Sequence, residues 1–176
     1  HGKSPHSLEF DYFVMAEDLL DFMDEEGIEK AHIVGHSMGG KTVMQFAVEN
    51  LSRVEKLVVV DIAPVDYPAG HEDIFKALFQ INIDELKSRK EAHEVLRPMI
   101  EEEGVRQFLL KNLARKKPSG FEWKFNLQAI HFNYTNILLN SLTDFDVFEG
   151  KTLFVKGGNS PRYIEVETME EVKIEN

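Results

Sequence analysis

One serine in the chain stands between two glycines, in the pattern G-x-S-x-G. The pattern occupies Gly35–Gly39, and a further glycine follows it. A short apolar segment, Ala31–Val34, precedes the pattern, and residues 41–50 follow it with apolar side chains at helical spacing. At a sharp turn between a strand and a helix, a serine hydroxyl is exposed and can attack a carbonyl carbon. The spacing therefore predicts acyl chemistry with Ser37 as the nucleophile.

The residues around Ser37 predict how this turn supports the chemistry. Gly35 and Gly39 are expected to leave room for close packing, while His36 fills the variable position and points away from the reacting atom. Ser37 is expected to have strained backbone dihedrals. The N–H of Met38, at the start of the helix, has no acceptor within the helix and can donate to an oxyanion. A glycine-rich turn with an N-capping serine is the alternative, and the flanking strand and helix favour the nucleophile.

A carboxylate stands at the end of the next apolar segment. Asp61 directly follows Leu57–Val60, a continuous apolar run that is typical of a parallel strand buried on both faces. A carboxylate at the tip of the strand next to the nucleophile strand can share a histidine with Ser37. Asp61 is therefore the candidate acid, with an N-capping or turn-forming role as the alternative. Asp66, which lies further into the following loop, is the second candidate acid.

The elements around these residues alternate between helix and strand. An amphipathic helix containing Tyr12 and ending at Gly27 comes first, followed by the strand, turn, helix and strand described above. A strand followed by glycines returns only at Thr152–Val155. Alternation of this kind predicts an α/β fold with a parallel sheet.

A mostly helical insertion separates the last two strands. Helical patterns occur near residues 72–79, 91–102 and 104–116, no clear strand appears before residue 152, and residues 120–139 are ambiguous between helix and extended chain. We therefore divide the chain into a core segment (1–61), a helical cap insertion (62–150) and a core strand with an acidic tail (151–176).

The insertion is rich in large apolar side chains, which either pack its helices together or form an apolar acyl pocket above Ser37. They are Phe75, Leu78, Phe79, Phe108, Leu109, Phe121, Trp123, Phe125 and Phe132. A small basic cluster, Arg115–Lys117, is expected to be a solvated helix end. Contact with the phosphate of an acyl-CoA is the weaker hypothesis for this cluster.

Several segments together resemble a known family. The residues Gly35–Gly40 look like the nucleophile elbow of the α/β-hydrolase superfamily. More narrowly, the segments 1–7 (HGKSPHS), 29–34 (EKAHIV), 61–67 (DIAPVDY) and 157–161 (GGNSP) resemble the YbfF-type esterase branch. The resemblance extends to about Ile164. It implies a partial α/β-hydrolase fold whose strands lie in the order 31–34, 57–60, 152–155, and hydrolysis of carboxylic esters or acyl thioesters under a helical cap.

The resemblance also shows which parts of a catalytic triad the chain provides. In most members the acid follows the strand after the cap, but only Gly157, Gly158, Asn159 and Ser160 stand there, and the YbfF-like branch uses the position of Asp61. The triad histidine is expected after a later strand, and residues 165–176 contain none. Of the histidines present, His71 and His131 are the candidates for a surrogate base. The second oxyanion donor is also expected upstream of His1, so the chain is expected to be a fragment.

Composition excludes several other classes of function. The 31 acidic residues outnumber the 20 basic ones, giving a net charge of −11, which disfavours nucleic acid and anionic membrane surfaces as partners. No apolar run approaches the length of a membrane span, and no signal peptide opens the chain. The absence of cysteine excludes a thiol nucleophile and a cysteine metal site, and the histidine spacing does not suggest a metal site either. We expect a cytoplasmic protein, although a targeting segment before His1 would not be visible.

We therefore expect a serine-dependent ester or thioester hydrolase that needs no cofactor and takes a small-molecule acyl substrate. Another chemistry of the same fold, C–C bond or lactone hydrolysis, is the alternative among enzymes. A non-catalytic remnant or binding module is the alternative from a different class, and the missing histidine favours it for this chain. The sequence does not predict the oligomeric state.

Overall fold

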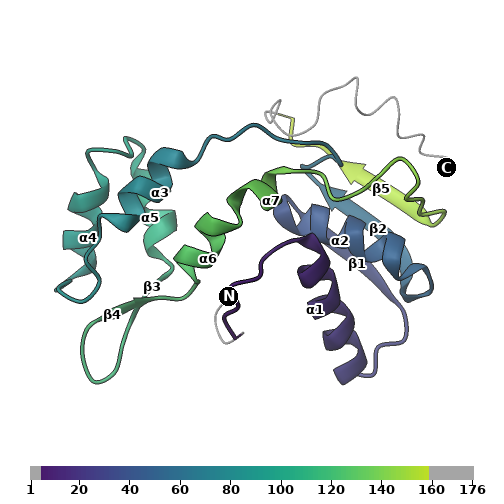
Figure 1. Cartoon of the computed structure of the whole chain (residues 1–176), viewed down its shortest axis with the longest axis horizontal. Helices are drawn as coiled ribbons and strands as arrows, with labels where there is room; N and C mark the ends of the chain where they lie inside the picture. The colour runs from purple at the N-terminus through teal and green to yellow at the C-terminus, as the bar shows by residue number, and fades with distance from the viewer. Residues whose placement is uncertain (1–4, 159–176) are drawn as a thin grey trace. The chain divides into compact units, whose positions relative to one another are not determined.

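The computed structural model describes residues 5–158, which form two compact units (Figure 1). Of the described residues, the first unit, which we call the sheet unit, contains Glu9–Tyr67 and 133–158. The second, the helical unit, contains 5–8 together with Pro68–Phe132. The helical unit is thus shorter than the insertion expected at 62–150, because both flanks of that insertion pack with the sheet. The predictions for Asn159–Pro161 and for the acidic tail lie outside the described residues.

The sheet unit is built on three parallel strands. These are β1 (Ala31–His36), β2 (Val54–Val60) and β5 (Lys151–Val155), paired in the order β1-β2-β5. The order and direction agree with the expected partial α/β-hydrolase fold. Both β1 and β2 are longer than predicted, since β1 continues through Gly35 and His36 and β2 already pairs with β1 from Val54.

Two helices pack against one face of this sheet. They are α1 (Tyr12–Glu25) and α2 (Met38–Glu49), and a short 3₁₀ turn (Leu51–Arg53) leads from α2 into β2. Asp11 begins α1 by accepting the N–H of Val14 at 2.9 Å. Gly27 follows its end with φ of 65°, and the N–H of Ile28 bonds the carbonyl of Met23, as in a Schellman motif. The core between helices and sheet is formed by Ala16, Met23, Ile33, Val43, Met44, Phe46, Ala47, Val54, Leu57, Val59 and Ile62.

The opposite face of the sheet is apolar and largely uncovered among the described residues. Register places Val34, Val58 and Leu153 side by side on it. Val34 is 65% exposed and Leu153 is 50% exposed, while Val58 is partly exposed. The expectation that the Leu57–Val60 run is buried on both faces is therefore wrong for the described residues. A continuous apolar run indicated a strand with two apolar faces, but it did not show that both are covered.

The helical unit contains four helices and a two-stranded hairpin. The helices are α3 (Glu72–Phe79), α4 (Arg89–Leu96), α5 (Glu103–Leu110) and α6 (Leu127–Phe132). The hairpin pairs β3 (Leu113–Arg115) with β4 (Phe121–Trp123) in antiparallel fashion. Leu96 of α4 and Leu113 of β3 are fully buried in this unit. The buried Arg106 donates to the carbonyl of Glu101 at 2.7 Å, which fixes the turn between α4 and α5.

The hairpin corrects the predicted secondary structure of the insertion. A helix over 104–116 was expected, and no strand before residue 152, but α5 ends at Leu110 and β3 begins at Leu113. Three-residue strands are too short to show the alternation of side chains by which a strand is recognised in a sequence. Gly120, with φ of 98°, lies in the connection, where a residue with a side chain would be strained.

Among helices of the described residues, none has the length and apolar character to cross a membrane.

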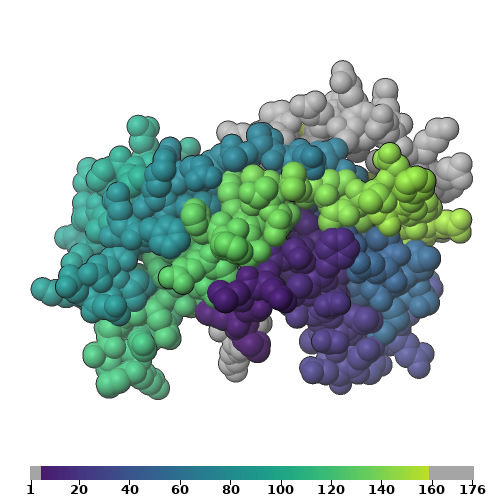
Figure 2. All heavy atoms as spheres, in the orientation of Figure 1, coloured from purple at the N-terminus to yellow at the C-terminus, as the bar shows by residue number. Residues whose placement is uncertain are grey.

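The chain returns to the sheet unit through α7 (Tyr134–Leu138). Leu142 and Phe148, which follow α7, are partly buried and pack against the core of the sheet unit. Figure 2 shows this returning segment, in yellow-green, lying against atoms of residues 30–60. The returning segment is therefore part of the sheet unit.

Candidate active site

The turn between β1 and α2 has the geometry expected of a nucleophile elbow. Ser37 lies directly after β1 and directly before α2. Its φ of 53° and ψ of −123° are values that residues with side chains seldom adopt, so the expected strain is confirmed. The N–H of Ser37 donates to the carbonyl of Val60 at 2.9 Å, and its own carbonyl accepts the N–H of Gly40 at 2.7 Å. These bonds hold the strained turn against β2.

The glycines of the turn have different roles. A Cβ on Gly35 would collide with the carbonyl oxygen of Gly39 and with Val43 of α2. A Cβ on Gly40 would collide with the side chain of Ile62, whereas a Cβ on Gly39 would meet no atom within 4 Å. Close packing therefore requires glycine at 35 and 40, and the expectation that it requires glycine at 39 is wrong. The pattern alone could not reveal this, because the collisions depend on how α2 crosses the sheet.

An amide suited to an oxyanion begins α2. Met38 is the first residue of this helix, so its N–H has no intrahelical acceptor four residues earlier. The residue is partly exposed, as is Ser37. His36 is exposed and lies on the opposite face of β1 from Gly35, because successive side chains of a strand alternate. His36 therefore points away from the face of β1 that packs against α2, and its predicted direction relative to the reacting atom stays a prediction.

Asp61 lies at the same edge of the sheet as Ser37. The two residues follow β2 and β1, which are neighbouring parallel strands. Asp61 also has a positive φ, 56°, and its N–H donates to the carbonyl of Val155 at 2.7 Å. Its Oδ1 accepts the N–H of Gly157 at 3.0 Å, which ties the carboxylate to the loop after β5. Whether the carboxylate serves Ser37 stays a prediction.

Asp66, the second candidate acid, has a clear structural contact. Its Oδ1 accepts the N–H of Asn140 at 2.6 Å, and the residue is exposed. Asp66 therefore caps the returning segment behind α7. Asp66 lies five residues beyond Asp61. Because Asp61 stands at the end of β2, Asp61 is the stronger candidate acid.

The histidines of the sheet unit lie on β1, where His32 and His36 are exposed on the uncovered face. In the helical unit, the ring of His131 packs edge-on against the rings of Phe75 and Phe79, at 4.9 and 5.2 Å between centroids. These aromatic contacts hold the ring of His131 in place, and its role as a surrogate base stays a prediction.

The remaining described histidines also have structural settings in the helical unit. His93 Nε2 accepts the Nε–H of Arg106 at 3.2 Å. His71 precedes α3 at the N-cap position, and His6 lies beside the carbonyl of Lys124 at 3.2 Å. Within residues 5–158, no group of three His, Asp or Glu side chains could hold a metal ion.

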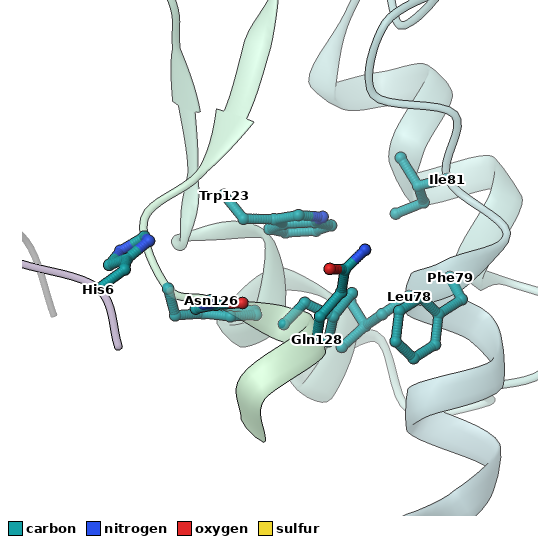
Figure 3. A pocket seen from close by; sticks show the side chains of 9 residues that line it. His6, Leu78, Phe79, Ile81, Trp123, Asn126 and Gln128 are labelled. Atoms are coloured by element: carbon teal, nitrogen blue, oxygen red, sulfur yellow. The ribbon is translucent and has the colours of Figure 1, made fainter. Parts of the chain in front are cut away.

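An open pocket of about 400 Å³, lined by both polar and apolar side chains, lies on the helical unit (Figure 3). In this view His6 lies at one side of the pocket and Phe79 and Ile81 at the other, with the ring of Trp123 between them. The Trp123 ring stacks on Phe125 at 5.4 Å between centroids. Phe108 and Phe132, however, are 64% and 86% exposed, so only part of the expected aromatic set packs inward.

The basic cluster at 115–117 lies on the hairpin and not at a helix end, which corrects the expectation. Arg115 ends β3, with its guanidinium over the ring of Phe121 at 5.3 Å. Lys116 and Lys117 are exposed in the connection that follows. These contacts do not support the hypothesis that the basic cluster binds the phosphate of an acyl-CoA.

Sequence reasoning missed one buried charged residue close to Ser37. Lys41, on α2, is only 2% exposed. Its ammonium donates to the carbonyls of Leu138 and Leu139 and lies over the rings of Tyr12 and Tyr67. Burial lowers the pKa of Lys41 to about 8, and the charge of Asp66 partly offsets this. A lysine on the otherwise apolar start of α2 was the available signal.

Comparison with known proteins places this geometry in a family. The family model described as alpha/beta hydrolase fold matches residues 1–89, which contain β1, the elbow, α2 and β2. The chain belongs to the α/β-hydrolase family. A solved structure titled marine microorganism esterase matches with a TM-score of 0.92 and 38% identity, over 99% of this chain and 69% of that one.

The curated relatives include esterases and lipases. Esterase YbfF of Escherichia coli (strain K12) is 39% identical over 162 residues, which is 92% of this chain and 61% of the relative. The sn-1-specific diacylglycerol lipase ABHD11 of Mus musculus is 37% identical over 166 residues, which is 91% of this chain and 53% of the relative. The chain thus spans between half and two thirds of the length of these relatives.

Proposed function

We propose that the natural protein containing this chain hydrolyses carboxylic esters with Ser37 as nucleophile. The observation that carries the proposal is the strained backbone of Ser37 at the junction of β1 and α2. Strain of this kind persists only where the surrounding structure enforces it, and it lifts the side chain out of the turn. The esterase and lipase relatives support the choice of ester as the substrate class.

In the proposed reaction, Ser37 Oγ attacks the acyl carbonyl carbon while a base accepts its proton. The Met38 N–H donates to the oxyanion that forms, and collapse of this intermediate expels the alcohol and leaves an acyl-serine. Water then attacks the acyl-serine and releases the acid. The N–H of Met38 suits this role because its direction is fixed by the first turn of α2.

Asp61 is proposed to orient the histidine that serves as the base. Its carboxylate is held by Gly157, and a carboxylate has enough lone pairs to accept an imidazole N–H in addition. We infer that this histidine comes from outside the 176 residues, because the family resemblance expects it after a later strand and because His32 and His36 lie on the uncovered face of β1. His71 and His131 stay the alternative bases. Thioesters are an extension of the same proposal, since they follow the same acyl-serine route.

A serine-directed probe tests the proposal. The natural protein is incubated with a fluorophosphonate, and its intact mass and its turnover of a short-chain nitrophenyl ester are measured. We expect one adduct on Ser37, and a Ser37→Ala variant that forms no adduct and loses about 10⁶-fold in kcat. Ser7, in the helical unit, provides the control variant Ser7→Ala, which should keep both properties. Near-normal turnover by Ser37→Ala would contradict the assignment.

A further inference from the structure

We propose that Lys41 is a positioning residue that fastens both chain connections of the helical unit to the helix that begins at the nucleophile. The chain leaves the sheet unit after Tyr67 and returns to it at Asn133. Lys41 lies on α2, four residues after Ser37. All the contacts that carry the inference lie within the sheet unit.

The ammonium of Lys41 holds the end of α7. Its Nζ donates to the carbonyl of Leu138 at 3.0 Å and to that of Leu139 at 2.9 Å. The last carbonyls of a helix have no partner within the helix and carry partial negative charge, so a cation is well suited to them. Lys41 therefore acts as a cap from another helix on the segment by which the chain returns.

The connection that leaves the sheet unit is joined to the same point. The N–H of Tyr67 donates to the carbonyl of Leu138 at 3.0 Å, so this oxygen receives both Lys41 and Tyr67. The ammonium also lies 4.9 Å from the centre of the Tyr67 ring, a distance at which a cation and an aromatic ring attract. The two connections thus meet at one carbonyl, which is also an acceptor of the buried ammonium.

Two tyrosine hydroxyls join further segments to the cluster formed by Lys41, Tyr67 and the carbonyls of residues 138 and 139. The Tyr12 hydroxyl donates to the carbonyl of Ile137 at 2.6 Å, which joins α1 to the returning segment. The Tyr67 hydroxyl accepts the N–H of Ala63 at 2.9 Å, two residues after Asp61. The cluster therefore links both proposed catalytic turns to both connections of the helical unit.

A buried cation is a costly way to fill this space, which argues for a positional role. No carboxylate lies within ion-pair distance of Lys41 Nζ in residues 5–158, and Asp66 acts on it only at longer range. An apolar side chain of the same length would avoid the desolvation of a charge. It would also remove the Lys41 donor from both carbonyls, leaving the Leu138 carbonyl with only the Tyr67 N–H. The interaction that justifies a lysine here is the attachment of residues 138 and 139.

Amide hydrogen exchange, measured residue by residue on the full chain, tests the attachment. In Lys41→Met we expect exchange at Tyr67, Leu139 and Asn140 to accelerate at least tenfold, while the amides within β2 keep their wild-type rates. The matched control is Lys30→Met, because Lys30 pairs with Glu55 on the surface, and it should leave residues 137–140 unchanged. Unchanged exchange at these positions in a folded Lys41→Met variant would overturn the proposal. Acceleration spread equally over β2 would also overturn it.

A milder variant decides the case if Lys41→Met does not fold. Tyr12→Phe removes only the hydroxyl on the Ile137 carbonyl and should accelerate exchange at residues 137–140 relative to wild type. Wild-type exchange there in Tyr12→Phe would then overturn the proposal. Lys41→Arg, which keeps a cation, should restore part of the protection lost in Lys41→Met.

The consequence for catalysis rests on the proposed function and needs a separate readout. If the connections position the helical unit for substrate, Lys41→Met in the natural protein should raise KM for a nitrophenyl ester at least tenfold, with kcat within threefold of wild type. A fall in kcat as large as the rise in KM, or no change in either constant, would contradict the positioning role. A wild-type protein without esterase activity would instead refute the proposed function, and the exchange measurement would still decide the attachment.

Discussion

Replacing Gly35 with alanine perturbs the elbow at its most crowded point. The added methyl group would collide with the carbonyl of Gly39 and would lie 2.5 Å from Val43 Cγ2. Overfilling a core costs about 1–3 kcal/mol where flexible side chains can yield. The Gly39 carbonyl is backbone within the turn itself, so we expect the upper end, about 3 kcal/mol. Gly39→Ala is the matched control, since its methyl group meets nothing within 4 Å and lies in the first turn of α2.

Urea unfolding of the two variants gives the comparison. Gly39→Ala should be neutral or stabilising by up to about 1 kcal/mol, because alanine favours helix over glycine. The difference of about 3–4 kcal/mol corresponds to a separation of about 1.5–2 M in the urea midpoint for a slope near 2 kcal/mol/M. Equal midpoints for Gly35→Ala and Gly39→Ala would refute the packing argument for the elbow.

Three further predictions concern the sheet unit. Because burial lowers the pKa of Lys41 to about 8, the unfolded chain binds this proton more strongly between pH 8 and 10. The free energy of unfolding should rise by about 2 kcal/mol across that window. Lys41→Met should abolish this rise. Above pH 10 the raised pKa of Tyr12 should make the free energy of unfolding of the wild-type protein fall again. The same dependence on pH in wild type and Lys41→Met between pH 8 and 10 would contradict the buried charge. Asp11→Ala should cost about 1 kcal/mol of stability by removing the cap of α1, and an unchanged urea midpoint would exclude this role. Val59→Thr should cost about 1–3 kcal/mol, because Val59 is fully buried, whereas Val34→Thr on the uncovered face should cost less than about 0.5; similar costs would contradict the one-sided sheet.

The sequence was sufficient to predict the sheet and the elbow because both depend on local patterns. Apolar runs mark β1, β2 and β5, and the glycine spacing around Ser37 marks the sharp turn. The position of Asp61 at the same edge follows from the parallel order of the strands. These features require only the periodicity of the chain and the rule that neighbouring parallel strands end together.

The parts that sequence could not predict depend on contacts between distant residues. The β3–β4 hairpin is too short for a recognisable period, and the need for glycine at 40 instead of 39 depends on the approach of Ile62. The burial of Lys41 could not be predicted, because the two carbonyls to which it donates lie 97 and 98 residues further along the chain. The base for Ser37 stays a prediction, since the sheet unit presents its histidines only on the uncovered face of β1.

The most direct test of the central claim is the reaction of Ser37 in the natural protein with a fluorophosphonate, followed by intact-mass and peptide analysis. The account predicts one adduct, on Ser37, together with hydrolysis of a short-chain nitrophenyl ester that the adduct abolishes. Full ester turnover after Ser37 is blocked, or an adduct on another residue with Ser37 unmodified, would contradict it.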